Sequence, residues 1–441
     1  MTSQSSAHDP FTYLSRGRFH RSIPCARTSS RVSFALVGDW ETHAKTGEDA
    51  DLIKSDLPQR SRLTLYVPPS GCSRWMGIIL DGVARQRGIC MVVPDRPGVG
   101  ATPAVPSHSR MRTSTQQTLS ILEALGVDQV DLFTHSGGWL YMLDLLRTRP
   151  ELIIPSPSGP ASNLMLCSPF VPTHLSSSSL GLLPASLVRM TPSAANLLGS
   201  CEKAITWSVG VGQNAKSMWG HKETPESLHA SKRDQLKRAA REREKSKRTH
   251  PNATFHPPYT THLDLELDAA VAEHLLAGGS ARKPQSGSKL LFECYMAESG
   301  IETTTQEFLF CLGKTSGMNN AELETWLSAN LRELARLLRS RTKRCSDTPN
   351  GGAPTAPPRL LLVWADQDFM TPQRGRDHLD DLLQRTGLAG ACSSTHRWIA
   401  AGAGHDDPPG SLDIMRGVFA FSKGESEISA LRAAQTPARA E

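Results

Sequence analysis

Long apolar segments are missing from this sequence. It contains no run of about 18 apolar residues, so no segment fits a membrane-spanning helix. Its first residues lack the apolar stretch of a secretory signal peptide, and its nine cysteines lack the spacing of a disulfide framework. These absences favour a reducing compartment, and we expect the protein in the cytoplasm. Residues 11–37, rich in Arg and Ser without an acidic residue, keep a mitochondrial location open as the alternative.

Motifs for nucleotides and metals are also missing. The sequence has neither a G-x-G-x-x-G pattern nor a P-loop, the two Gly-rich turns that cradle phosphates. It also lacks the C-x-x-C or His/Cys spacing of a zinc site. We therefore expect no nucleotide cofactor and no metal.

The positive charge is concentrated in one segment. The formal net charge is +6, and residues 221–250 alone contain ten Lys or Arg and five Asp or Glu. The rest of the chain is close to neutral, so the sequence does not predict the continuous basic face of a nucleic-acid-binding protein. We expect no nucleic-acid partner, and the sequence leaves the oligomeric state open.

Strand and helix patterns alternate in the first part of the chain. Short apolar runs that fit buried strands are separated by segments with apolar residues at helical spacing. This rhythm predicts an α/β fold with a mostly parallel central sheet and helices on both faces. The expected strands in this part are Ser33–Gly38, Arg62–Val67, Ile89–Val93, Val130–His135 and Asn163–Cys167, and the expected helices are Trp75–Arg87, Thr113–Leu125 and Trp139–Arg147.

The rhythm breaks after Pro169 and returns at Arg359. We predict a core in two parts, residues 33–168 and 351–424, separated by a mainly helical insertion, residues 169–350, with polar tails at 1–32 and 425–441. The basic segment 221–250 is expected to be a solvated helix or a disordered loop. Further helices are expected at Ser186–Leu198, Leu263–Leu276 and Glu322–Arg339 in the insertion and at Arg374–Gln384 and Leu412–Phe421 in the core, with strands at Arg359–Trp364 and Thr395–Ile399.

A sharp turn follows the strand Val130–His135. Ser136 comes directly after the strand and is followed by Gly137 and Gly138, the small residues that a tight strand-to-helix reversal requires. Thr134 stands where the usual G-x-S-x-G pattern has its first Gly. We predict a nucleophile elbow that exposes the hydroxyl of Ser136.

Two further polar residues follow later strands. Asp368 and His405 each lie in a loop just past the end of a predicted parallel strand, at the sheet edge where α/β proteins bind ligands. A neutral serine hydroxyl needs a base such as His405 to take its proton, and Asp368 would hold the imidazole tautomer. Asp366 is the rival for the role of the acid.

The order Ser, acid, His resembles that of the α/β-hydrolase family. Three further motifs are similar to that family: Asp95–Gly100 to its D-x-P-G-x-G turn, Ala365–Asp368 with Pro372 to its acid turn, and Gly402–His405 to its G-x-G-H turn. The turn at residues 68–74 resembles fungal members. The resemblance implies a cap at residues 169–350 and a loop-fixing role for Asp95 and Arg96. It also implies an oxyanion hole made by the backbone N–H of Gly137 and one N–H from the Ser70–Cys72 turn, for which Gly71 is our choice.

The expected activity is that of a cofactor-free serine hydrolase. Ser136, His405 and Asp368 would cleave a small-molecule ester, or an amide or thioester, through an acyl-enzyme. An acyltransferase on the same triad and a non-catalytic ligand-binding protein are the alternatives. The insertion has no readable motif, so the sequence does not identify the acyl substrate.

Overall fold

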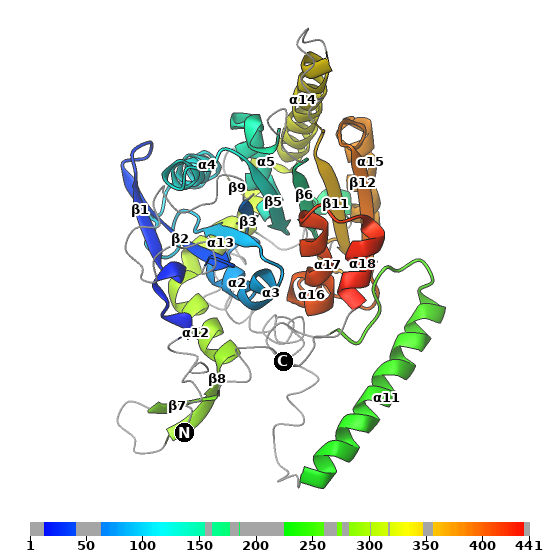
Figure 1. Ribbon diagram of the computed structural model, residues 1–441. Coiled ribbons are helices and arrows are strands. Elements are labelled where there is room, and N and C mark those ends of the chain that lie inside the picture. Colours follow the sequence, from blue (N-terminus) through cyan, green and yellow to red (C-terminus); the bar gives the residue numbers. More distant parts are fainter. Residues whose placement is uncertain are drawn as a thin grey trace.

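The computed structural model describes residues 13–40, 63–154, 161–176, 185, 225–259, 271–275, 282–299, 301–315, 318–346 and 356–435. An eight-stranded sheet in the order β1-β2-β4-β3-β5-β6-β11-β12 forms its centre (Figure 1). β2 pairs antiparallel with β1 and β4, and the remaining neighbours pair in parallel. The strands are β1 (Arg21–Cys25), β2 (Ser30–Gly38), β3 (Leu63–Val67), β4 (Cys90–Pro94), β5 (Val130–His135), β6 (Asn163–Cys167), β11 (Arg359–Ala365) and β12 (Ser394–Ala400).

Successive residues of the central strands are buried on opposite faces of this sheet. In β11, Leu360, Leu362 and Trp364 pack on one face, and Leu361 and Val363 on the other. The first face is covered by α4 (Ser107–Ala124), α5 (Gly138–Thr148), α14 (Asn320–Ser346) and α15 (Gln373–Arg385), and the second by α2 (Trp75–Ile78), α3 (Asp81–Gln86), α12 (Gly287–Ser299), α17 (Leu412–Ser422) and α18 (Glu427–Gln435). The prediction of a mostly parallel sheet with helices on both faces is confirmed.

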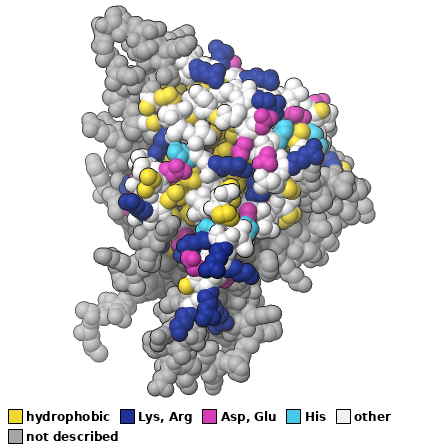
Figure 2. Space-filling view, turned by 90° about the vertical axis from the view of Figure 1, so that its right-hand side faces the viewer, with side chains coloured by type: hydrophobic (Ala, Val, Ile, Leu, Met, Phe, Trp, Pro, Cys, Tyr) yellow, Lys and Arg dark blue, Asp and Glu magenta, His cyan; other side chains and the backbone are white. Residues whose placement is uncertain are grey.

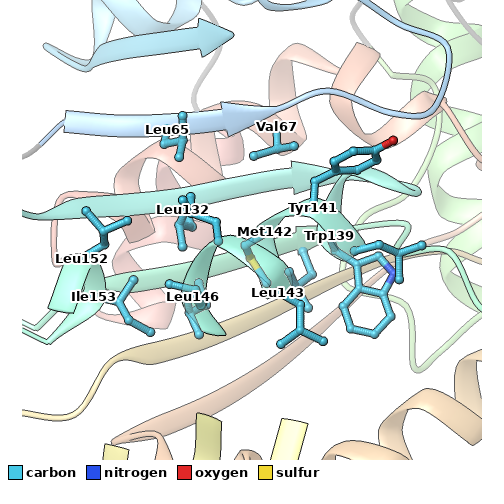
Figure 3. Close-up of a cluster of buried hydrophobic side chains, with 14 of the residues drawn as sticks. Leu65, Val67, Leu132, Trp139, Tyr141, Met142, Leu143, Leu146, Leu152 and Ile153 are labelled. Carbon is cyan, nitrogen blue, oxygen red and sulfur yellow. The ribbon is translucent and has the colours of Figure 1, made fainter. Parts of the chain in front are cut away.

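Figure 3 shows how the nucleophile-bearing part of the core is packed. Leu65 and Val67 of β3 and Leu132 of β5 face the α5 side chains Met142 and Leu146. The Tyr141 ring lies at the border of this cluster, and its hydroxyl points away from the aliphatic side chains (Figure 3). Burying this apolar surface fixes α5, and with it the turn that precedes α5.

Several boundaries differ from the predictions. Arg21–Cys25, which we assigned to a polar tail, forms the edge strand β1, whose Ser, Pro and Arg residues give no apolar alternation. The predicted helix Trp75–Arg87 is divided into α2 and α3. Helix α4 begins at Ser107 instead of Thr113, after Pro106 and through a polar first turn. The assigned C-terminal tail contains α18, which buries Ala430 and Ala434.

The insertion between β6 and β11 is mainly helical in its described parts. It contains α6 (Thr173–Ser176), α11 (Pro225–Thr249), β7 (Val271–Leu275), β8 (Arg282–Ser286), α12, α13 (Ile301–Cys311), β9 (Lys314–Thr315), β10 (Met318–Asn319) and α14. The helix predicted over Leu263–Leu276 is wrong at its end, because β7 pairs there with β8. The predicted helix Ser186–Leu198 lies outside the described residues.

The basic segment is largely helix α11, which projects away from the body of the protein (Figure 1). Figure 2 shows Lys and Arg side chains gathered over the part of this helix at residues 237–249. Beyond α11, Thr254 and Phe255 donate their N–H groups to the carbonyl oxygen of Ile399 at 2.7 and 3.0 Å. The insertion thereby covers the edge of β12, an exposed strand edge that would otherwise offer unpaired backbone groups. None of the described helices is long and apolar enough to cross a membrane.

Candidate active site

Ser136 lies on a strained turn between β5 and α5. Its φ angle is 51°, in the left-handed region that L residues other than Gly rarely adopt. A Cβ on Gly137 would lie 2.2 Å from Ser70 Oγ, and one on Gly138 would lie 2.3 Å from the carbonyl oxygen of Val67. The two glycines therefore let the end of β3 approach the turn closely. The structure has the tight reversal that the sequence predicted.

Thr134 is accommodated in place of the first Gly of the elbow pattern. Its side chain is fully buried, and its hydroxyl has no hydrogen-bond partner among the described residues. An unpaired buried hydroxyl costs about 1–3 kcal/mol. The elbow thus forms with Thr at this position despite an unfavourable polar burial.

The side chains of Ser136, His405 and Asp368 meet at the carboxyl ends of the parallel strands. His405 Nε2 lies 2.8 Å from Ser136 Oγ, and His405 Nδ1 lies 2.7 Å from Asp368 Oδ2. All three residues are buried. With Nδ1–H donating to the carboxylate, the lone pair of Nε2 faces the serine hydroxyl and can take its proton.

The carboxylate of Asp368 is fixed in place by backbone donors. Its Oδ1 accepts hydrogen bonds from the N–H groups of Met370 and Thr371, both at 2.8 Å. The rival acid Asp366 points elsewhere: it accepts from the N–H of Gly402 at 2.5 Å and pairs with His250 at 3.1 Å. Of the two candidate acids, Asp368 is the one that contacts His405.

Burial and charge act against each other on the pKa values of this pair. Burial alone would lower the pKa of His405, but the charge and hydrogen bond of Asp368 outweigh it and raise the pKa above its usual value. Burial alone would raise the pKa of Asp368, yet the charge of His405 and the hydrogen bonds to the carboxylate lower it. The pair therefore favours an imidazolium beside a carboxylate, the charge state that forms when His405 takes a proton.

His135 supports the loop that carries His405. Its Nε2 donates to the carbonyl oxygen of His405 at 3.2 Å and lies 3.3 Å from Asp406 Oδ1. Burial lowers its pKa to about 4, so the ring is neutral near pH 7. Asp406 faces His135, and the neighbouring Asp407 accepts from the N–H of Gly404 at 2.6 Å.

One grouping among the described residues brings metal-binding atoms together. Candidate ligand atoms of His135, His405 and Asp406 lie within 4.8 Å of one another. Both ring nitrogens of His405 already face Ser136 and Asp368. An ion here would have to displace one of those partners, so the donor set fits the hydrogen-bonded arrangement better than a metal site.

The Ser70–Cys72 turn lies beside the elbow, but its N–H groups differ in availability. The N–H of Gly71, our choice from the sequence, donates to Glu307 Oε2 at 2.8 Å, and that of Cys72 donates to the carbonyl oxygen of Pro69 at 3.1 Å. The N–H groups of Ser70 and Gly137 have no acceptor within the described part of the chain. Two N–H groups near Ser136 are thus unengaged.

Sequence reasoning missed Glu307. This residue of α13 is buried against Arg96, Arg110 and Tyr141 and binds the turn next to the elbow. No motif marks it among the acidic residues of the insertion. Its role depends on how the insertion packs on the core.

The sheet order and the site together define the fold. The chain has the α/β-hydrolase fold, with the serine on the turn after β5, the acid after β11 and the histidine after β12. No protein-family model matches the sequence, and no curated protein matches it significantly.

Solved structures resemble the chain at low sequence identity. An epoxide hydrolase, VrEH1 from Vigna radiata, has 14% identity and a TM-score of 0.44, covering 92% of this chain and 98% of its own. Serine hydrolase CCSP0084 from the bacterium Cycloclasticus zankles has 12% identity and a TM-score of 0.42, covering 94% and 96%. The enol-lactonase from Burkholderia xenovorans has 11% identity and a TM-score of 0.41, covering 93% and 100%.

Proposed function

We propose that the protein is a serine hydrolase that cleaves a small-molecule ester through an acyl-enzyme. Ser136 is the nucleophile, His405 the general base and acid, and Asp368 the residue that orients the imidazole. The observation that carries this assignment is the position of His405, 2.8 Å from the serine hydroxyl and 2.7 Å from the carboxylate. Amides and thioesters undergo the same chemistry and are secondary candidates.

Acylation begins with the transfer of the hydroxyl proton of Ser136 to His405 Nε2. The serine oxygen forms a bond to the carbonyl carbon of the ester, and the carbonyl electrons move to the oxygen. When this tetrahedral species collapses, the bond to the alkoxy oxygen breaks, and His405 donates its proton to the leaving alcohol. The products are the free alcohol and an ester between the acyl group and Ser136.

Deacylation repeats these steps with water. His405 takes a proton from water, the resulting oxygen nucleophile attacks the acyl carbon, and the proton returns to Ser136 Oγ as its bond to the acyl group breaks. The carboxylate of Asp368 stabilises the imidazolium in both halves. The net reaction converts ester and water into acid and alcohol.

Fixed donors are needed for the negative oxygen of each tetrahedral species. The unengaged N–H of Gly137 is the first, since Gly137 follows the nucleophile. Our sequence-based choice for the second was Gly71, but its N–H is bound to Glu307, whereas the N–H of Ser70 has no described acceptor. We therefore assign the second donor to Ser70. Loss of one such donor typically lowers kcat about 10²- to 10³-fold.

A fluorophosphonate probe tests the proposal directly. Wild-type protein should be labelled at Ser136, the Ser136→Ala variant should not, and a panel of nitrophenyl esters of increasing acyl length should reveal the preferred substrate. A wild-type protein that neither reacts with the probe nor hydrolyses any ester would contradict it. Added alcohols or amines would divert the acyl group if the protein is instead a transferase.

A further inference from the structure

The turn that carries the assigned oxyanion donor is attached to the insertion. Both backbone polar groups of Gly71 bind insertion side chains: the N–H donates to Glu307 Oε2 at 2.8 Å, and the carbonyl accepts from the Tyr295 hydroxyl at 3.2 Å. Ser70 Oγ lies 3.0 Å from Cys311 Sγ. Helices α12 and α13 thus contact this turn through side chains from three separate positions.

Gly71 and α13 are also in close steric contact. The φ angle of Gly71 is +75°, and a Cβ at this position would lie 2.8 Å from Thr304 Cγ2. A residue with a side chain would therefore push α13 away from the turn. The backbone of the turn and the helix of the insertion are packed directly against each other.

Glu307 links the turn to charged residues of the core. Its Oε2 pairs with Arg96 at 2.7 Å, and its Oε1 accepts from the Tyr141 hydroxyl at 3.1 Å and lies 3.4 Å from Arg110. Glu307 and the two arginines are all at most 3% exposed. A buried carboxylate with this many donors has one allowed position, which makes it a rigid anchor for Gly71.

Arg96 extends this anchor along the turn. Its guanidinium donates to the carbonyl oxygen of Pro68 at 2.7 Å and also to that of Pro69. Together, Arg96 and Glu307 hold the backbone at three residues, Pro68, Pro69 and Gly71. Ser70 lies between these residues, and its N–H has no acceptor among the described residues.

We propose that Glu307 and Tyr295 are positioning residues that orient the oxyanion turn, with the N–H of Ser70 presented to the reacting carbonyl. This inference rests on the proposed function. Donors stabilise a developing oxyanion only if they are already oriented when the charge forms. Because the insertion binds both the N–H and the carbonyl oxygen of Gly71, it prevents the peptide planes of the turn from rotating. The insertion thereby holds part of the proposed catalytic site in place.

Two variants separate this role from simple packing. Glu307→Asp keeps the charge beside Arg96 and Arg110 but is one methylene too short to reach Gly71, and Tyr295→Phe removes the hydroxyl that binds the Gly71 carbonyl and lies 3.6 Å from Cys72 Sγ. We expect kcat and the rate of fluorophosphonate labelling to fall about tenfold or more in Glu307→Asp and about threefold or more in Tyr295→Phe, with KM changed less than about threefold.

The matched control is Thr303→Val. Thr303, also on α13, donates to the carbonyl oxygen of Gly98 at 2.9 Å, outside the Ser70–Cys72 turn. The Thr303→Val variant shows how much kcat and the labelling rate change when α13 merely packs less tightly against the core. Glu307→Gln serves as the rescue variant, because an amide keeps the reach to Gly71, and it should retain more activity than Glu307→Asp. If both positioning variants match Thr303→Val in kcat and labelling rate, the proposal is wrong.

Amide hydrogen exchange provides a readout that does not depend on activity. The amides of residues 71–73 should exchange about tenfold faster in Glu307→Asp, while those of β5 and α5 stay protected. If Glu307→Asp does not fold, the same comparison with Tyr295→Phe decides the question. A wild-type protein without labelling or esterase activity would contradict the proposed function, and unchanged exchange in the variants would contradict the positioning role.

Discussion

His135 donates a hydrogen bond from Nε2 to the backbone carbonyl of His405, and the two rings lie 5.3 Å apart. The residue before the proposed nucleophile therefore supports the backbone of the proposed base. Because His135 ends β5 and His405 follows β12, this contact, together with the one between Ser136 and His405, links two strand ends that are not neighbours in the sheet. Five predictions follow from this site.

The strain at Ser136 should be separable from its chemistry. Ser136→Ala should lower kcat by at least about 10⁴-fold, because the nucleophile is lost. Ser136→Gly should be equally inactive but more stable by about 1 kcal/mol, because Gly tolerates a φ of 51° without steric cost. Urea unfolding of both variants measures the difference. Equal stability of the two would show that the turn stores no strain.

The two acids near the site should differ sharply when neutralised. Asp368→Asn should lower kcat about 10⁴-fold, because an amide favours the wrong imidazole tautomer. Asp366→Asn is the matched control: it weakens contacts to Gly402 and His250 and should change kcat less than about tenfold. Steady-state kinetics of both variants with one ester decide between them, and a larger effect at Asp366 would reverse our assignment.

Activity should rise with pH. Protonated His405 cannot accept the proton of Ser136, so kcat/KM should increase as pH rises through the pKa of His405, with a midpoint above the usual value near 6.5. The raised pKa also stabilises the fold below pH 6.5, and this contribution is lost as pH rises through the folded-state pKa. The pH profile of the residual activity of Asp368→Asn should have a lower midpoint than that of wild type, because the negative charge that raises the pKa of His405 is gone. A pH–rate profile with a midpoint below 6 in wild type would contradict this.

His135 should make the fold sensitive to acid. Its pKa falls from 6.5 to about 4 through burial, so the unfolded chain binds a proton that the folded protein excludes. The buried, neutral His135 therefore does not lower the free energy of unfolding above pH 6.5. As pH falls from 6.5 toward 4, the free energy of unfolding drops by about 3 kcal/mol, because the unfolded chain binds the proton. His135→Gln, which keeps a donor and does not titrate, should lose less stability across this range. Urea unfolding at pH 7 and pH 4.5 provides the test, and parallel losses in both proteins would count against it.

Replacing Gly138 should destabilise the turn after β5, because the backbone of Val67 packs directly against Gly138. In Gly138→Ala the new Cβ would lie 2.3 Å from the carbonyl oxygen of Val67, so the backbone must shift. We expect a loss of about 1–3 kcal/mol in stability and at least tenfold lower labelling of Ser136. Gly390→Ala is the control, because a Cβ there meets no atom within 4 Å. Thermal unfolding and labelling rates compare the two, and similar behaviour would contradict the packing argument.

The sequence alone predicted most of the core elements. β6 was predicted with its observed bounds, and the strands and helices of residues 351–424 were predicted to within about two residues, because local apolar periodicity directly reflects burial in an α/β sheet. The edge strand β1 was missed because half-exposed Ser and Arg residues carry no such signal. The segment of β7 was predicted as the end of a helix, since short apolar runs fit both structures.

For the site, the sequence by itself determined which residues follow the strand ends and in what order. Ser136, Asp368 and His405 each lie at a loop position that neighbouring residues along the chain define. The sequence favoured Asp368 over Asp366 as the acid through the spacing to Pro372, and the structure places Asp368 in contact with His405. The engagement of the Gly71 N–H by Glu307 was decided only by the tertiary structure. These contacts join residues far apart in the chain, such as Gly71 and Glu307, so their partners depend on how the insertion packs against the core and leave no local pattern to read.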